Sequence, residues 1–197
     1  MLKTHFSNLY LIWYWISKMQ RNNSKITKKI IIMGLDNSGK TSIVLCLKGV
    51  KNLTSFSAIK PTRGFEINKF NTMGSDFNIW DFGGQEKFRE DYVKNFKDHI
   101  QGTSKLIYVL DVQDRVRYDL SLQYLTKIIA LLKKNKLNLE FSLFLHKFDP
   151  DMELIHEEIN EEVIQTLIKQ IEKIIPESFP HQIYKTSIYT VFQKSII

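Results

Sequence analysis

Gly34-Leu-Asp-Asn-Ser-Gly-Lys-Thr41 decides the fold of this chain, because it reads G-x-x-x-x-G-K-T, the spacing of a phosphate-binding P-loop. An apolar run over 30–33 precedes the motif, and residues 42–48 follow with helical character. Strand, glycine loop and helix is the order that turns backbone N–H groups and a helix N-terminus toward a polyphosphate. The motif alone leaves the nucleotide open, since kinases, ATPases and GTPases share it.

This loop supplies most of the expected phosphate contacts. Lys40 is expected to reach the terminal phosphates, and the Thr41 hydroxyl is expected to bind Mg²⁺. A glycine turn followed by a surface lysine is the alternative for the motif taken alone. The nucleotide-binding residues expected here are Asp36, Asn37, Ser38, Gly39, Lys40, Thr41 and Ser42.

Composition predicts an ordinary globular domain of 197 residues, with 43% hydrophobic and 25% charged residues. The single cysteine, Cys46, cannot form an internal disulfide, which favours a reducing compartment. The formal net charge of +7 is uneven, because residues 1–29 hold six basic residues and no acid. The remainder is nearly neutral, so we expect no nucleic-acid partner.

The first residues predict an amphipathic helix that lies in the plane of a membrane. The apolar run Leu9–Ile16 is far shorter than the roughly 20 residues of a bilayer span. A signal peptide, a helix packed permanently on the domain and a self-association surface are the alternatives. We expect residues 1–24 to be this helix and a basic linker, and residues 25–197 to be the nucleotide-binding domain. The expected membrane contacts are Phe6, Leu9, Trp13 and Ile16.

Strands and helices alternate over the remainder, which predicts an α/β fold with a six-stranded, mostly parallel sheet flanked by helices. One hairpin is expected to turn near Asn71–Gly74. The expected strands are Lys29–Met33, Phe65–Phe70, Phe77–Trp80, Lys105–Asp111, Phe141–His146 and Gln182–Lys185. The expected helices are Lys40–Lys48, Glu86–Phe96, Tyr118–Lys134, Glu158–Ile174 and a last one from about Tyr189.

Further polar motifs fall at strand ends, where ligands bind in such folds. After the third strand, Asp81 is suited to hold a Mg²⁺ water, Gly84 to offer its N–H to a terminal phosphate, and Gln85 to orient an attacking water. Thr62, in the loop before the second strand, is suited to complete the Mg²⁺ shell. Taken singly, these residues also fit a helix cap or a turn.

The last two strands end in residues suited to a purine base. In His146-Lys-Phe-Asp149, Asp149 is expected to accept two N–H groups on one edge of guanine, and Lys147 to lie along the base. His146 can donate only one hydrogen bond. In Lys185-Thr-Ser-Ile188, the backbone N–H groups of Ser187 and Ile188 are expected to meet the guanine oxygen.

Over roughly residues 29–190 the chain resembles the small GTPases, and most closely the Arf and Arf-like family. The segments GLDNSGKT, PTRGF and WDFGGQEKFR carry this resemblance, together with the interval from Gly64 to Trp80. His146 departs from that family, which has asparagine there, and HKFD and TSIY look more like the Rag GTPases. We expect the dimerisation domain of the Rag proteins to be absent and the nucleotide-binding domain to be monomeric.

The resemblance implies a molecular switch that hydrolyses GTP to GDP with Mg²⁺. It also implies an exchange factor, an activating protein, effectors that bind the switch segments, and reversible association with the cytosolic face of a membrane. Arf proteins share Asp36 and hydrolyse GTP slowly alone, and we expect no arginine of this chain beside the phosphates. A GTP-binding scaffold with little hydrolysis is the second hypothesis, and an ATP-dependent enzyme is disfavoured by the HKFD motif.

Overall fold

The computed structural model describes residues 27–50, 52–72, 75–137 and 139–188. The expected amphipathic helix with its four membrane residues, the middle of the hairpin turn and the helix expected from about Tyr189 lie outside these ranges. The division into residues 1–24 and 25–197 therefore stays a prediction.

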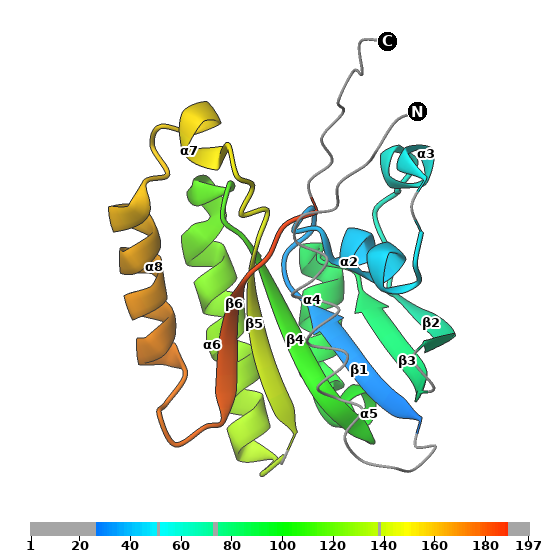
Figure 1. Ribbon diagram of the computed structural model, residues 1–197. Helices are drawn as coiled ribbons and strands as arrows, with labels where there is room; N and C mark the ends of the chain where they lie inside the picture. Colours follow the sequence, from blue (N-terminus) through cyan, green and yellow to red (C-terminus); the bar gives the residue numbers. More distant parts are fainter. Residues whose placement is uncertain (1–26, 51, 73–74, 138, 189–197) are drawn as a thin grey trace.

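A six-stranded sheet forms the centre of the described structure, in the order β2-β3-β1-β4-β5-β6 (Figure 1). β2 pairs antiparallel with β3, and every other pairing is parallel. All six predicted strands are confirmed, and the hairpin strands β2 and β3 are both longer than predicted. The strands are β1 Lys28–Met33, β2 Phe65–Thr72, β3 Ser75–Phe82, β4 Thr103–Asp111, β5 Glu140–His146 and β6 His181–Lys185.

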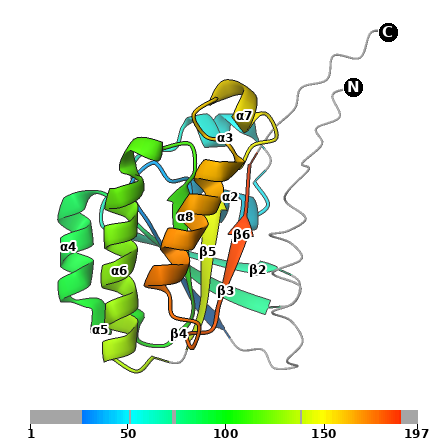
Figure 2. The same ribbon diagram turned by 90° about the vertical axis from the view of Figure 1, so that its left-hand side faces the viewer.

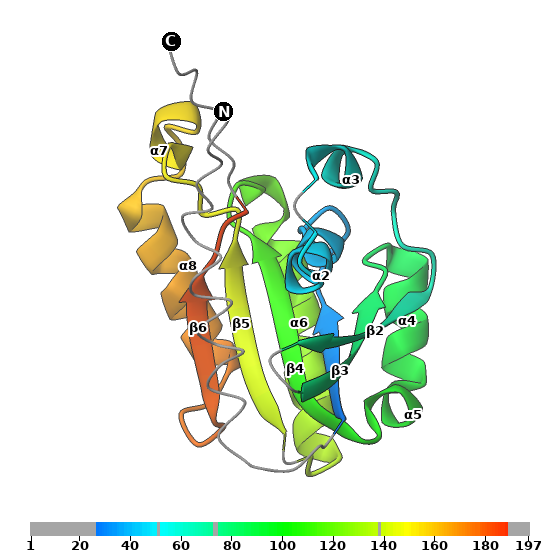
Figure 3. The same cartoon turned by 45° about the vertical axis from the view of Figure 1, so that its right-hand side comes forward.

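Helices lie on both faces of this sheet. Figure 2 shows α4, α6 and α8 side by side on one face, and Figure 3 shows α2 on the opposite face. None of the helices in the described ranges is long and apolar enough to cross a bilayer. The helical segments are α2 Lys40–Leu47, α3 Leu53–Ser57, α4 Glu86–Lys94, α5 Phe96–Ile100, the 3-10 turn η1 Arg115–Arg117, α6 Tyr118–Lys134, α7 Met152–Ile155 and α8 Glu161–Ile174.

Two helix predictions need correction, and two short helices were missed. The helix expected over Glu86–Phe96 is two helices, α4 and α5, which meet at Asn95. α8 begins three residues later than expected, because the Asn160 side chain accepts a hydrogen bond from the Val163 N–H at 3.1 Å and caps the helix. The short helices α3 and α7 were not predicted, because four or five residues are too few to display a helical period.

Strand alternation divides the core in two. Ile30 and Ile32 of β1 pack with α2, whereas Ile31 and Met33 pack with the cluster that includes α6 and α8. Each of these four side chains is almost fully buried, and burial of such a side chain contributes about 1.5–3 kcal/mol. The sheet is therefore held on both faces, and the carboxyl ends of β1, β3, β4 and β5 meet at one edge.

Candidate nucleotide-binding site

The P-loop connects β1 to α2 and depends on two glycines. Gly34 passes so close to β4 that an added Cβ would lie 2.2 Å from the Val109 carbonyl oxygen. Gly39 has φ +87°, a left-handed conformation that glycine adopts without strain. These two positions let the loop curl tightly at the N-terminus of α2, which leaves backbone N–H groups free to face an anion.

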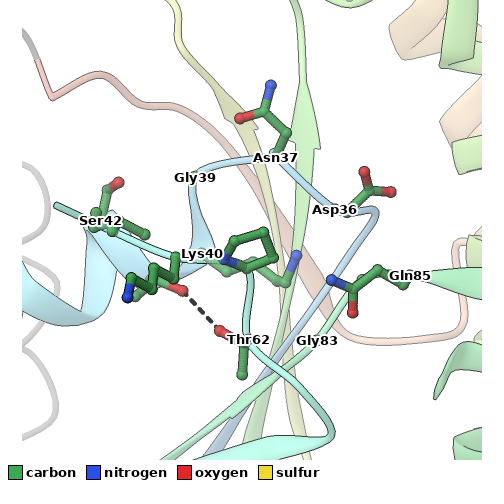
Figure 4. Close-up of a pocket in the computed structure, with 13 residues that line it drawn as sticks. Asp36, Asn37, Gly39, Lys40, Ser42, Thr62, Gly83 and Gln85 are labelled. Atoms are coloured by element: carbon green, nitrogen blue, oxygen red, sulfur yellow. Dashed lines mark hydrogen bonds between the residues drawn. The ribbon is translucent and has the colours of Figure 1, made fainter. Parts of the chain in front are cut away.

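This loop and two later segments enclose a pocket of about 350 Å³ (Figure 4). Asp36 and Gln85 lie on one side of the pocket and Ser42 on the other. Ser38 is buried behind the loop, and its hydroxyl is 3.4 Å from Lys40 Nζ. The residues that line the pocket are Asp36, Asn37, Gly39, Lys40, Thr41, Ser42, Ile59, Lys60, Pro61, Thr62, Gly83, Gly84 and Gln85.

Lys40 is a buried cation at the floor of this pocket. Its Nζ donates to the Leu35 carbonyl oxygen at 2.5 Å. Burial lowers the pKa of Lys40 to about 8, while the charges of Asp81 and Asp36 oppose the shift. A buried ammonium group whose charge the nearby carboxylates do not fully compensate is suited to bind phosphate oxygens.

Three oxygen-bearing side chains converge beside the pocket. The Thr41 hydroxyl donates to Asp81 Oδ2 at 2.6 Å and lies 3.2 Å from the Thr62 hydroxyl (Figure 4). Burial raises the pKa of Asp81. Asp81 Oδ1 is buried and accepts no hydrogen bond from the described residues. Hydroxyl and carboxylate oxygens with an unused acceptor fit the needs of Mg²⁺, a hard cation that keeps several of its waters.

The segment after β3 lies against the P-loop. A Cβ on Gly84 would lie 2.0 Å from the Asp36 nitrogen, so only glycine allows this approach. Gln85 follows at the pocket wall, and its Oε1 is buried without a hydrogen-bond partner among the described residues. An unsatisfied amide oxygen at this place is suited to accept a proton of a water molecule.

His146 lies between the P-loop and the end of β6. Its Nδ1 is 2.9 Å from the Thr186 hydroxyl, and an added Cβ on Gly39 would come within 2.5 Å of its ring. Burial, with a smaller contribution from the charge of Lys147, lowers the pKa of His146 to about 3. The imidazole is therefore neutral near pH 7 and packs against the loop, a contact that the sequence did not predict.

The loop after β5 is held by the loop after β4. The Gln113 side-chain amide donates to Asp149 Oδ2 at 2.7 Å and to the Lys147 carbonyl oxygen at 2.8 Å. Lys147 has φ +61°, and its Nζ lies 2.6 Å from Asp111 Oδ2. The Ser187 hydroxyl also donates to Asp149. The structure thus brings Lys147, Asp149 and Ser187 together.

Ile188 follows directly and packs against the α2 side of the core. Sequence reasoning missed three residues of this edge: Asp111, Gln113 and Arg117. Arg117 contacts Asp36 of the P-loop, a pairing that the sequence did not predict. In the sequence, the acidic residue Asp36 within the phosphate-binding loop was the signal that a basic partner lies nearby.

Known proteins match this fold and motif set. Residues 29–196 match the Gtr1/RagA G protein conserved region. The chain is also similar to the solved structure of the Arl6 BBS3 small GTPase from Trypanosoma brucei with bound nucleotide analogue GppNp, at 22% identity and a TM-score of 0.62. That similarity covers 82% of this chain and 87% of the other, and it shows that this chain has the fold of a small GTPase. Because the family match spans most of its length, this chain belongs to the Gtr1/RagA family of small GTP-binding proteins.

Proposed function

We propose that this protein is a switch that binds GTP and GDP with Mg²⁺ and hydrolyses GTP slowly. The observation that carries the proposal is the meeting, at one edge of the sheet, of the P-loop pocket, the cluster of Thr41, Thr62 and Asp81, and the loop of Asp149. Membership of a G-protein family supports guanine as the base.

In this proposal the pocket receives the phosphates. Lys40 exchanges its bond to the Leu35 carbonyl oxygen for the terminal phosphate oxygens, and the backbone N–H groups of the loop surround them. Thr41 and Thr62 hold Mg²⁺ through their hydroxyls, and Asp81 holds it through water. The bound Mg²⁺ neutralises negative charge on the phosphates.

At the other end of the site, Asp149 accepts the two N–H groups on the edge of guanine while Lys147 lies along the base. The backbone N–H groups of Ser187 and Ile188 meet the guanine oxygen. His146 has the structural role of holding Gly39 at the base side of the phosphates. This assignment gives the adenine edge no matching donors and acceptors.

For hydrolysis, Gln85 orients the attacking water and the Gly84 N–H group binds the terminal phosphate. We expect Gln85→Leu to remove most of the hydrolysis that an activating protein stimulates, because leucine cannot orient water. Single-turnover hydrolysis of labelled GTP measures this effect. Gln165→Leu, at an exposed glutamine on α8, is the matched control. Undiminished turnover in Gln85→Leu would exclude the role given to Gln85.

We propose that the bound nucleotide controls the conformation of two segments and, through them, the binding of the protein to a membrane. With GTP, Thr62 and Gly84 are held by the terminal phosphate and its Mg²⁺, and hydrolysis releases both. We propose that residues 1–24 are masked with GDP and bind the cytosolic face of a membrane with GTP, because their aromatic and basic residues suit an anionic surface. Exchange factors, activating proteins and effectors would act on the two segments that contain Thr62 and Gly84.

Co-sedimentation of the full chain with vesicles tests this coupling, with GDP or a non-hydrolysable GTP analogue and with or without anionic lipid. Binding with the GTP analogue alone supports it, and equal binding in both states contradicts it. A GTP-binding scaffold with little turnover remains the second candidate, because the family match is to the Gtr1/RagA G protein conserved region. Stimulated hydrolysis that depends on Gln85 decides between the two candidates.

A further inference from the structure

Arg117 of η1 is fixed between two carboxylates. Its Nη1 lies 3.2 Å from Asp36 Oδ1, and its Nη2 donates to the Asp36 carbonyl oxygen at 3.3 Å. On the other side, its Nε donates to Asp114 Oδ2 at 2.5 Å. The hydrogen bond that Arg117 donates to Asp114, together with the charges of Asp114 and Asp36, raises the pKa of Arg117, so the guanidinium stays charged.

Asp36 stands between Arg117 and the phosphate pocket. It lines that pocket together with Lys40 and Gln85 (Figure 4), and it also lines the small cavity behind the P-loop that Arg117 and Asp114 line. Both charges act on the floor of the pocket, since Asp36 raises the pKa of Lys40 and Arg117 lowers it. A carboxylate and its counter-ion therefore sit beside the place proposed for the terminal phosphate.

The charge of Asp36 should affect the binding of GTP more than the binding of GDP. A carboxylate at the pocket wall repels phosphate oxygens, and it repels GTP more because the third phosphate brings further negative charge to that end. A guanidinium behind the carboxylate cancels much of this repulsion, and its two contacts hold Asp36 at the wall. Without Arg117, the full charge of Asp36 would face the terminal phosphate.

We propose that Arg117 is a positioning residue that neutralises and holds Asp36 and so sets the preference of the P-loop for GTP relative to GDP. The inference rests on the proposed function, because it places the phosphates of GTP in this pocket. It assigns Arg117 no direct contact with the nucleotide.

The test measures dissociation constants of the full chain with Mg²⁺ for GDP and for a non-hydrolysable GTP analogue. We expect Arg117→Ala to weaken the GTP analogue about tenfold or more relative to GDP. A tenfold change lies between the interaction energy of two unit charges about 4 Å apart in bulk water and the larger energy of such a pair near a protein surface. Arg117→Ala combined with Asp36→Asn should restore the wild-type ratio, because the repelling charge is gone. Arg115→Ala is the control, since Arg115 donates to the Glu158 carbonyl oxygen and not to the P-loop.

If Arg117→Ala loses equal affinity for both nucleotides, the inference is overturned. It is also overturned if adding Asp36→Asn to Arg117→Ala does not restore the wild-type ratio of affinities, a result that would instead point to direct contact of Arg117 with phosphate. If Arg117→Ala does not fold, Asp36→Asn alone decides. It removes the repelling charge and leaves Arg117, so it should raise the preference for the GTP analogue, and a lowered or unchanged preference contradicts the inference. A wild-type chain that binds neither guanine nucleotide refutes the proposed function itself, which is a different result.

Discussion

Replacing Gln113 by methionine should weaken guanine binding while leaving phosphate binding intact. The Gln113 amide donates two hydrogen bonds, to Asp149 Oδ2 at 2.7 Å and to the Lys147 carbonyl oxygen at 2.8 Å. Methionine has a similar length and shape but no N–H donor. The change therefore removes the hydrogen bond from Gln113 to the carboxylate proposed to recognise guanine and leaves the one from Ser187. It also removes the support of Lys147, whose φ is +61°.

The size of the effect follows from these bonds. A hydrogen bond to a charged group contributes about 1.5–3 kcal/mol. If this whole contribution serves to orient Asp149 for guanine, its loss lowers the affinity for GDP by about 10-fold to 150-fold. Inosine diphosphate lacks the exocyclic amine, so it makes one contact fewer to the carboxylate and should lose less. The ratio of GDP to inosine diphosphate affinity is thus the quantity that reports on Gln113.

Isothermal titration of both nucleotides, with wild-type protein and the Gln113→Met variant, measures this ratio. Gln123→Met is the matched control, because Gln123 is exposed on α6. The positioning role predicts a smaller ratio in Gln113→Met and no change in the control. Equal weakening of both nucleotides would mean that Gln113 supports only the fold, and unchanged binding would refute the reasoning outright.

Two further predictions test the P-loop. Gly39→Ala should unfold at least about 3 °C below Gly49→Ala in thermal scans. Both positions have positive φ, but only at Gly39 would the Cβ meet the His146 ring, at 2.5 Å, whereas nothing lies within 4 Å of a Cβ at Gly49. Equal unfolding midpoints of the two variants would show that the contact with His146 does not limit the residue at position 39. In the second prediction, affinity for GDP should fall as the pH rises above about 8, because Lys40 has a pKa of about 8 without nucleotide and must take up a proton to bind phosphate. Calorimetry from pH 7 to 9.5, in buffers of different ionisation enthalpy, measures both the affinity and the proton uptake. An affinity that does not change with pH contradicts the role of Lys40 in binding phosphate.

Local patterns predicted most of the fold. The six strands were found because runs such as Ile30–Met33 are continuous and apolar, and because glycines and polar residues bound them. Thr62 and Asp81 were placed near the P-loop because the ends of neighbouring strands meet at one edge of the sheet. The start of α8 was misplaced, since its position depends on one cap, Asn160.

Contacts between distant parts of the chain were beyond prediction. Arg117 meets Asp36 across 81 positions, and Gln113 meets Asp149 across 36. Neither pair leaves a periodic pattern in the sequence, because each depends on how the loop after β4 folds over the sheet edge. The same holds for His146, because its packing against Gly39 depends on how the P-loop lies against the end of β5.

Competition binding tests the central claim most directly. The full chain with Mg²⁺ and a fluorescent GDP is titrated with GTP, GDP and ATP. A guanine-nucleotide switch predicts that GTP and GDP displace the probe at concentrations at least about 100-fold lower than ATP, because a site built to hydrogen-bond one base leaves buried groups unpaired with another. Displacement by ATP at comparable concentrations, or no binding of the probe at all, would contradict the claim.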